Sequence, residues 1–395
     1  MSLLLRVKKV GNDQVIYLDN SATTKPFQEV VDAFSKTSLR FFANPASIHS
    51  EALEAEKLLS RARQQLASLL HADEEELVFT SGGTEGNHMA IFGRARAMQH
   101  RGKHIITTKL EHPSVQKPIE HLEQEGFEVT WLTPNQRGVV TAEQVKDALR
   151  DDTILVSIMH VNNELGSIQP VQEVASLLAT HPLAAFHVDH VQGAAKLPLA
   201  LRQLPIDLLT LSSHKFHGMK GSGVLFVRKG TALSPIQIGG TQEGGRRAGT
   251  VSVPGAVALA KAFRLAAERY ETEWVHLGTI SQQFRDLLAS MKGVRVLSPP
   301  DAIPTIVNIA VPGLKAEILI HALSRQGIFA STQSACSTRT YAPSRVLLEC
   351  GHSEIVAGSA IRFSLSCETK QKDLERAATV FQQALHSLQK VMKPS

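Results

Sequence analysis

Seven short apolar runs between residues 76 and 229 constrain the fold of this chain more than any other feature. They are rich in Val, Ile, Leu and Phe, and helical stretches or loops separate many of them. In chain order the runs are ELVFT, HIITTK, FEVTWL, TILVSIM, AAFHVDH, DLLTLSS and GVLFVRK. Continuous apolar runs of this length are typical of strands buried on both faces of a mostly parallel sheet. The sequence therefore predicts an α/β domain in which helices cover the sheet.

A second, smaller domain is expected in the C-terminal part. Residues 253–292 have a long helical pattern, and shorter apolar runs follow it. The last helix has one apolar stripe, which predicts docking on its own domain, with a coiled-coil partner helix as the alternative. The stripe consists of Leu374, Ala378, Phe381, Leu385, Leu388 and Met392. Because 395 residues are enough for two domains, we expect a large domain at 16–260 and a small α+β domain made of 1–15 and 261–395.

Charge, apolar length and cysteine spacing argue against several classes of protein. The 42 basic and 37 acidic residues include no run of five like charges, so the basic balance alone does not predict nucleic-acid binding. No stretch of about 18 apolar residues is present to span a membrane. Cys336, Cys350 and Cys367 form neither an even disulfide framework nor a C-x-x-C pair. We expect a soluble, cytoplasmic protein with no metal site, no membrane contact and no direct nucleic-acid partner.

The segment ELVFTSGGTEGN combines a strand, a glycine-rich turn and the start of a helix. Such a segment directs backbone N–H groups and a helix N-terminus at one point, where a phosphate can bind. A purely structural strand-to-helix loop is the alternative, so this segment needs a chemical partner elsewhere in the chain.

Two further strand ends supply that partner. HVDHVQ at 187–192 and LSSHKFHG at 211–218 each end an apolar strand, where open α/β sheets place their ligands. A lysine such as Lys215 forms a Schiff base with an aldehyde cofactor, and a carboxylate such as Asp189 keeps a pyridine nitrogen protonated. Together these residues predict a pyridoxal-phosphate site, whereas a solvated surface lysine is the alternative for Lys215.

Ten motifs then follow one another along nearly the whole chain. They are YLDNSATT, NPASIH, FTSGGTEGN, LEHPSV, MHVNNELG, HVDHVQ, SSHK, GGTQEGGRRAGT, SACS and IRFSLS. In order and spacing they resemble those of the cysteine desulfurases, which belong to the class V aminotransferase group of pyridoxal-phosphate enzymes. The resemblance implies fold type I of these enzymes: a large domain with a mostly parallel, seven-stranded mixed sheet, and a smaller α+β domain.

The resemblance also implies roles around the cofactor ring. Lys215 would hold the cofactor and later move protons at the substrate α-carbon, and Asp189 would pair with the pyridinium nitrogen. His112 would stack on the ring and act as a general acid or base. Gln192 and Asn163 would lie near the ring hydroxyl and the substrate. Without the family context, His112 could merely end a strand and Asn163 could cap a turn.

A second group of residues would bind the cofactor phosphate. The resemblance assigns this role to Thr84, Ser212 and His214, with Gly83 leaving room for the backbone. Taken alone, His214 could be a satisfied buried imidazole. Thr250 is similar to the residue that reaches the phosphate across a dimer interface in this family, so a homodimer is implied.

The chemistry of sulfur removal falls to Cys336 and Arg362. Cys336 lies in QSACSTRTYAPSR, a segment of small, polar and turn-forming residues, as expected for a thiolate that must reach the substrate and then swing out. Arg362 would bind the substrate carboxylate through two parallel hydrogen bonds, with an ordinary surface arginine as the alternative. The number of residues between Cys336 and Arg362 is similar to that in the family branch with the longer mobile cysteine loop. This similarity favours L-cysteine over selenocysteine as the substrate.

The implied reaction converts L-cysteine to L-alanine and leaves a persulfide on Cys336. A protein acceptor would then take the sulfur, either an iron–sulfur scaffold or a tRNA-thiolation enzyme. Selenocysteine lyase and class V aminotransferase are the enzymatic alternatives, and a pyridoxal-phosphate-binding partner scaffold is the non-enzymatic one. His190 departs from the small residue usual beside the pyridinium-pairing acid, and Cys367 has no family role; both are left without a function.

Overall fold

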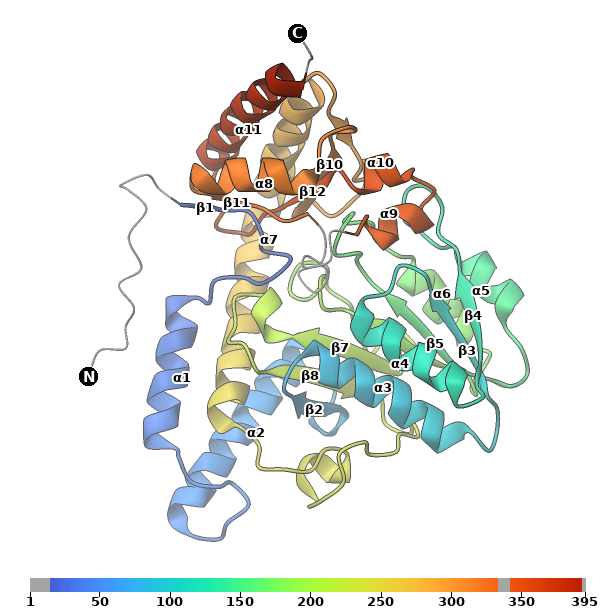
Figure 1. Cartoon of the computed structure of the whole chain (residues 1–395). Coiled ribbons are helices and arrows are strands. Elements are labelled where there is room, and N and C mark those ends of the chain that lie inside the picture. The colour runs from blue at the N-terminus through green and yellow to red at the C-terminus, as the bar shows by residue number, and fades with distance from the viewer. Residues whose placement is uncertain (1–14, 333–341, 393–395) are drawn as a thin grey trace.

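The computed structural model describes residues 15–332 and 342–392, and its centre is a seven-stranded sheet with the order β2-β8-β7-β6-β5-β3-β4 (Figure 1). The strands are β2 (Leu77–Thr80), β3 (His104–Thr108), β4 (Glu128–Leu132), β5 (Thr153–Met159), β6 (Ala185–Asp189), β7 (Leu208–Ser212) and β8 (Gly223–Val227). β8 is antiparallel to β2 and β7, whereas the other neighbours are parallel. Each predicted apolar run forms one strand, so the mostly parallel mixed sheet is confirmed.

Helices cover both faces of this sheet. On one face, α3 (Gly83–Met98) and α4 (Pro113–Gln124) pack on a core that includes Ile105 and Leu155. The other face packs against a larger core shared by the remaining helices of this part. These are α1 (Gln28–Arg40), α2 (Ser50–Leu70), α5 (Ala142–Ala148), α6 (Val171–Leu178) and the long α7 (Val253–Ala289). Within the described ranges, no helix is both long and apolar enough to cross a membrane.

The edge strand β4 differs from the expected burial on both faces. Glu128 is exposed and the next three residues are half-buried, so only Leu132 is fully buried. β4 ends the strand order and pairs only with β3. β4 is thus less covered than the other edge strand, β2, whose four residues are all buried.

The C-terminal part builds two small sheets. β12 (Ala360–Ser364), β10 (Ile306–Ala310) and β9 (Arg295–Val296) form an antiparallel sheet, while β1 (Ile16–Tyr17) pairs in parallel with β11 (Ile328–Phe329). The helices here are α8 (Ala316–Arg325), α9 (Arg345–Glu349), α10 (Glu354–Ala357) and α11 (Gln371–Met392). Figure 1 shows α7 running from beside α1 and α2 up to this part. Strands and helices mix as an α+β domain requires, and the boundary near residue 260 stays a prediction.

The final helix α11 docks inside its own chain. Leu374, Ala378, Phe381 and Leu385 of the predicted stripe are buried, and the helix contacts α7 and α8. The ring of Phe381 meets that of Phe363 edge-on. The stripe is therefore satisfied by intramolecular packing, as predicted, and needs no coiled-coil partner.

Candidate active site

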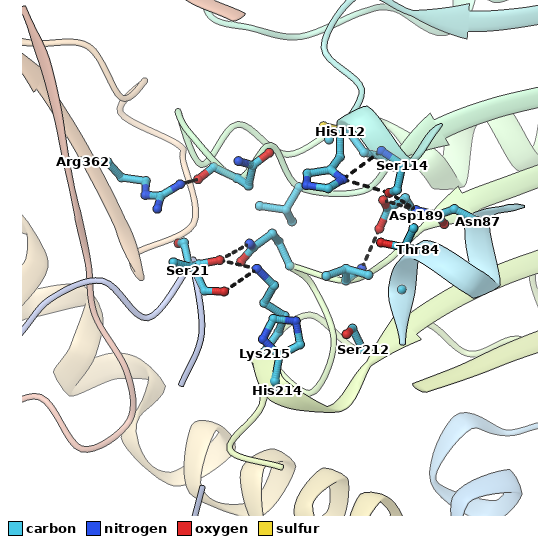
Figure 2. A pocket seen from close by; sticks show the side chains of 17 residues that line it. Ser21, Thr84, Asn87, His112, Ser114, Asp189, Ser212, His214, Lys215 and Arg362 are labelled. Atoms are coloured by element: carbon cyan, nitrogen blue, oxygen red, sulfur yellow. Dashed lines mark hydrogen bonds between the residues drawn. The ribbon is translucent and has the colours of Figure 1, made fainter. Parts of the chain in front are cut away.

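A cavity of about 210 Å³ lies where β5, β6 and β7 end and where α3 begins (Figure 2). Ten of the predicted site residues line it. These are Gly83, Thr84, His112, Asn163, Asp189, Gln192, Ser212, His214, Lys215 and Arg362. Parallel strands that end at one edge of a sheet bring their following loops together, which is why residues far apart in the sequence meet here.

The amine of Lys215 is held by main-chain carbonyl groups. Lys215 ends a short 3₁₀ helix (Ser213–Lys215) directly after β7, and its Nζ donates to the carbonyl oxygens of Ser21 at 2.6 Å and Ala22 at 3.0 Å. Burial, together with the nearby cation of Arg362, lowers the pKa of Lys215 to about 8. A lysine with a lowered pKa has a larger neutral fraction, and the neutral amine is the form that attacks a carbonyl carbon.

The carboxylate of Asp189 has a fixed orientation at the end of β6. Its Oδ2 accepts a hydrogen bond from Asn87 Nδ2 at 2.9 Å, and its Oδ1 accepts one from the backbone N–H of Val191 at 3.0 Å. Asn87 Nδ2 also donates to Ser114 Oγ at 2.9 Å. Asp189 is only 6% exposed. A buried carboxylate anchored in this way can face a cationic ring nitrogen without turning away.

His112 is the N-cap of α4, and this position determines the state of its imidazole. Its Nδ1 accepts the backbone N–H of Ser114 at 3.1 Å and lies 2.8 Å from Ser114 Oγ. Burial lowers the pKa of His112, although the Asp189 carboxylate opposes the shift. Since Nδ1 is an acceptor, the ring is neutral with its proton on Nε2, as a general acid or base requires at neutral pH.

The start of α3 and the end of β7 form a close cradle. A Cβ atom added to Gly83 would lie 3.0 Å from Val191 and 3.4 Å from Ser212 Cβ, so glycine keeps this space open. Thr84 and Ser212 supply hydroxyl groups to the same cavity. His214 Nδ1 lies 3.1 Å from Thr23 Oγ1, and burial lowers its pKa to about 4. The donors are thus hydroxyls, a neutral imidazole and a helix N-terminus, a set suited to a phosphate.

Arg362 lies at the opposite end of the cavity from Asp189 (Figure 2). It extends from β12, and its Nη1 and Nη2 donate to the carbonyl oxygen of Asn163 and to Asp19 Oδ1, both at 2.9 Å. Its Nε is buried and has no partner among the described residues. Burial raises the pKa of Asp19, while Arg362 opposes the shift. A guanidinium that holds one carboxylate here can also hold that of a ligand.

Comparison with known proteins places this geometry in a family. Residues 16–377 match the family model described as aminotransferase class-V. The chain is 38% identical to cysteine desulfurase IscS of Dictyoglomus turgidum, over 95% of this chain and 96% of that protein. It is 41% identical to putative cysteine desulfurase IscS 1 of Bacillus subtilis, over 92% and 96%. The chain belongs to the cysteine desulfurases of the class-V aminotransferase family.

Two solved structures share the fold of this chain. A NifS-like protein superposes with a TM-score of 0.89 at 31% identity, covering 95% of this chain and all of the other, 100%. A structure described as SspA in complex with cysteine gives a TM-score of 0.78 at 32% identity, covering 90% and 100%. The predicted pyridoxal-phosphate fold type I is therefore confirmed.

Thr250 is the one predicted site residue of the described ranges that does not line the cavity. Thr250 is exposed at the end of the loop that follows a short 3₁₀ helix, η3 (Gln242–Gly245). Glu243 anchors this loop, because its side chain accepts from Arg63 Nη2 at 2.6 Å and from the backbone N–H of Phe79 at 2.7 Å. Cys336 lies outside the described residues, so its predicted role stays a prediction.

Four cavity or cavity-edge residues were missed by the sequence reasoning, although each lies in a quoted motif of the desulfurase family. Asn87 holds Asp189 and Ser114 contacts both Asn87 and His112, while Ser21 holds Lys215 and Asp19 holds Arg362. Asn87 could have been found, since it follows Gly83 by one helical turn and therefore faces the same side. For Ser21 and Asp19 the sequence carries no such signal, because their partners lie more than a hundred residues away.

His190 and Cys367, the two residues without a predicted role, do not line the cavity. His190 Nδ1 lies 2.8 Å from His160 Nδ1, with the two rings stacked, and burial lowers the pKa of His160 to about 4. The Sγ of half-buried Cys367 lies 3.8 Å from His217 Nε2, and burial raises the pKa of Cys367 to about 12. Burial also raises the pKa of the Cys350 thiol to about 12. Both thiols are therefore poor nucleophiles, because the thiolate is the reactive form.

Proposed function

We propose that this chain removes sulfur from L-cysteine with pyridoxal phosphate as its cofactor. The observation that carries the proposal is the juxtaposition of Lys215, Asp189 and Arg362 in one cavity. An amine with a lowered pKa, a fixed carboxylate and a guanidinium match the aldehyde and the ring nitrogen of the cofactor and the carboxylate of an amino acid. The membership in the cysteine desulfurases supports the reaction type.

Buried polar atoms support the fit of this cofactor. Asn87 Oδ1 and Gln192 Oε1 are buried with no partner among the described residues, which is costly unless a bound group supplies donors. Lys215 would hold the aldehyde carbon and Asp189 would face the ring nitrogen. The cradle of Gly83, Thr84, Ser212 and His214 would bind the phosphate. When bound, the protonated ring withdraws electrons from the substrate α-carbon.

Lys215 and His112 would carry the protons. The amine of Lys215, with a pKa of about 8, can both take a proton from the α-carbon and return one near neutral pH. His112 Nε2 is free of the Ser114 contacts and would exchange a proton with the substrate. Two groups of this kind allow the proton to leave one atom and arrive at another within one cavity.

Substrate binding would require Asp19 to release or share its hydrogen bond with Arg362. Arg362 Nη2 donates to Asp19 Oδ1, so the carboxylate of L-cysteine would replace or share this contact. The raised pKa of Asp19 makes its protonation, and hence its release of the guanidinium, less costly. Arginine suits this exchange because its planar fork can hold a carboxylate through two bonds.

The sulfur would leave on Cys336. Its thiolate attacks the substrate sulfur, so a sulfur–sulfur bond forms while the Cβ–S bond breaks. The electron pair left on the product is then protonated, which yields L-alanine. The persulfide would pass to a protein acceptor, such as an iron–sulfur scaffold or a tRNA-thiolation enzyme.

We further propose a homodimer in which Thr250 reaches the partner's phosphate cradle. We also propose a cytoplasmic location.

Product stoichiometry tests the proposal. The protein supplied with pyridoxal phosphate, L-cysteine and a thiol reductant should release L-alanine and sulfide in equal amounts. Lys215→Ala should abolish the reaction and the covalent cofactor adduct detected by mass after reduction. Lys220→Ala, which changes an exposed lysine nearby, should preserve both. A keto acid formed from an amino donor without sulfide would contradict the desulfurase and indicate an aminotransferase.

A further inference from the structure

A second cavity, of about 500 Å³, shares a wall with the active site. Asp189 and Gln192 of one segment line the active site, whereas His190 and Lys196 of the same segment line the second cavity. The end of α2 and the middle of α7 complete its walls. Cavities of a few hundred Å³ that are mainly apolar and have a few polar groups are typical ligand sites.

Most of this cavity is apolar. Its wall includes six large apolar side chains, namely Leu70, Leu199, Leu201, Leu209, Phe263 and Trp274. Glu271, which also lines it, belongs to the exposed residues of α7. An apolar wall and an acidic group disfavour a multiply charged anion such as a nucleotide phosphate, which would lose its hydration without enough counter-charge.

Lys196 gives the cavity a buried cation. The residue is only 8% exposed, and its Nζ donates to the carbonyl oxygen of Gln192 at 3.2 Å and lies 5.8 Å from the ring centre of Tyr270. It forms no ion pair with a carboxylate in the described part of the chain. An ammonium group has three donors, and burying it without a counter-charge is costly. Glu271 lines the same cavity but is exposed and forms no ion pair with Lys196, so this buried cation has no direct carboxylate partner among the described residues.

We propose that this cavity is a second ligand site, which takes an amphipathic carboxylate with its acid group on Lys196 and its apolar part against Phe263, Trp274 and the leucines. A single carboxylate supplies the missing counter-charge, and burial of an apolar chain or ring supplies the rest of the binding free energy. The site requires neither the cofactor nor the desulfurase reaction, so the proposal stands independently of the proposed function.

Calorimetric titration of the cofactor-loaded protein tests the charge pairing. The probes are 4-phenylbutyrate and its uncharged amide, 4-phenylbutanamide. We expect one saturable site that binds the carboxylate about tenfold or more tightly than the amide, the scale of one charge-assisted hydrogen bond. Lys196→Met should remove this preference, whereas Lys292→Met, at an exposed lysine of the small domain, should keep it. Equal affinity for the two probes, or an unchanged preference in Lys196→Met, would overturn the proposal.

Two further variants distinguish this cavity from the active site, where Arg362 could also bind a carboxylate. Arg362→Gln should leave the binding of 4-phenylbutyrate intact, while Ala267→Trp should block it by filling the cavity. Binding should also change the fluorescence of Trp274, and Trp274→Phe should remove that change. Binding that is lost in Arg362→Gln but kept in Ala267→Trp would assign the probe to the active site and refute the proposal. Ala267→Trp keeps the test decisive if Lys196→Met does not fold.

Discussion

Asp189 depends on Asn87 for its orientation, and Asn87 in turn bridges to Ser114 beside His112. One carboxamide therefore connects the proposed ring-nitrogen partner with the proposed acid–base residue. Both hydrogens of the Asn87 amide group are used in these bonds. Its role is to position other residues, because it is their groups that would face the reacting atoms.

We predict that Asn87→Ala lowers kcat about 10- to 100-fold, since a hydrogen bond to a charged group contributes about 1.5–3 kcal/mol. Steady-state kinetics with L-cysteine measures the effect, and the absorbance of the bound cofactor reports whether its environment has changed. Asn135→Ala, at an exposed turn residue that does not line the cavity, is the control and should retain normal kcat. A normal kcat with unchanged cofactor absorbance in Asn87→Ala would show that the bridge is dispensable.

Lys215 should attach the cofactor in a pH range set by its lowered pKa. Its amine is protonated below about pH 8 and neutral above it, and only the neutral form attacks the aldehyde. The attachment rate to cofactor-free protein should therefore rise up to about pH 8 and then level off, whereas an ordinary lysine would continue to about pH 10.4. Stopped-flow absorbance measures the rate. Arg362→Gln removes a neighbouring cation and should move the plateau to higher pH, and a plateau that does not move would contradict this explanation.

Most residues of the proposed site lie at the ends of helices and strands. Asp189 ends β6, Lys215 ends the 3₁₀ helix after β7, His112 caps α4 and Gly83 begins α3. Arg362 alone comes from the middle of a strand, β12 of the small sheet. The position of Arg362 therefore depends on how the small sheet packs on its helices, and the proposed role of Arg362 in substrate binding depends on that packing.

Phe381 shows how strongly this packing should stabilise the chain. Its ring is fully buried and contacts Phe363, which in turn contacts Phe284 of α7. We predict that Phe381→Ala destabilises the chain by about 3–5 kcal/mol through loss of apolar contact and the cavity left behind. Denaturant unfolding monitored by circular dichroism measures the change. Gln382→Ala, at an exposed position of the same helix, should change stability by less than about 0.5 kcal/mol. A similar loss in both variants would mean that α11 contributes through helix formation rather than through packing.

In the whole molecule, the anchored loop before Thr250 has no function that a single chain explains. Glu243 is clamped by Arg63, and Arg247 pairs with Glu85 at 2.8 Å, yet Thr250 itself is exposed and outside the cavity. A rigid loop with an exposed hydroxyl suits contact with another copy of the chain. This agrees with the proposed homodimer.

Mixed dimers test whether Thr250 serves the partner's site. In a dimer of one Lys215→Ala chain and one Thr250→Ala chain, both defects fall on the same site if Thr250 acts across the interface. The other site is then intact, so the mixed dimer should bind half the cofactor of the wild type with wild-type affinity. Differential tagging isolates the dimer, and absorbance titration measures binding. Weakened affinity at the remaining site would show that Thr250 acts within its own chain.

The sheet and the reactive residues at its strand ends could be predicted from the order of residues along the chain. Continuous apolar runs can be buried only between two layers. Asp189 lies at the end of one such run, and Lys215 lies shortly after another. The helix α11 was equally predictable, because a stripe at helical spacing needs a single apolar surface to pack on. These features depend on neighbours along the chain, which the sequence contains.

Only the tertiary structure decided which distant residues meet. Ser21 lies beside Lys215 and Asp19 beside Arg362 because β1 pairs with β11 and Asp19 forms a bridge to Ser364 at the end of β12. His190 turns to His160, and Lys196 is buried without a counter-charge. These contacts depend on packing between segments with no local pattern to connect them. Spacing along the chain predicts the end of a strand, but not what lies across the space beyond it.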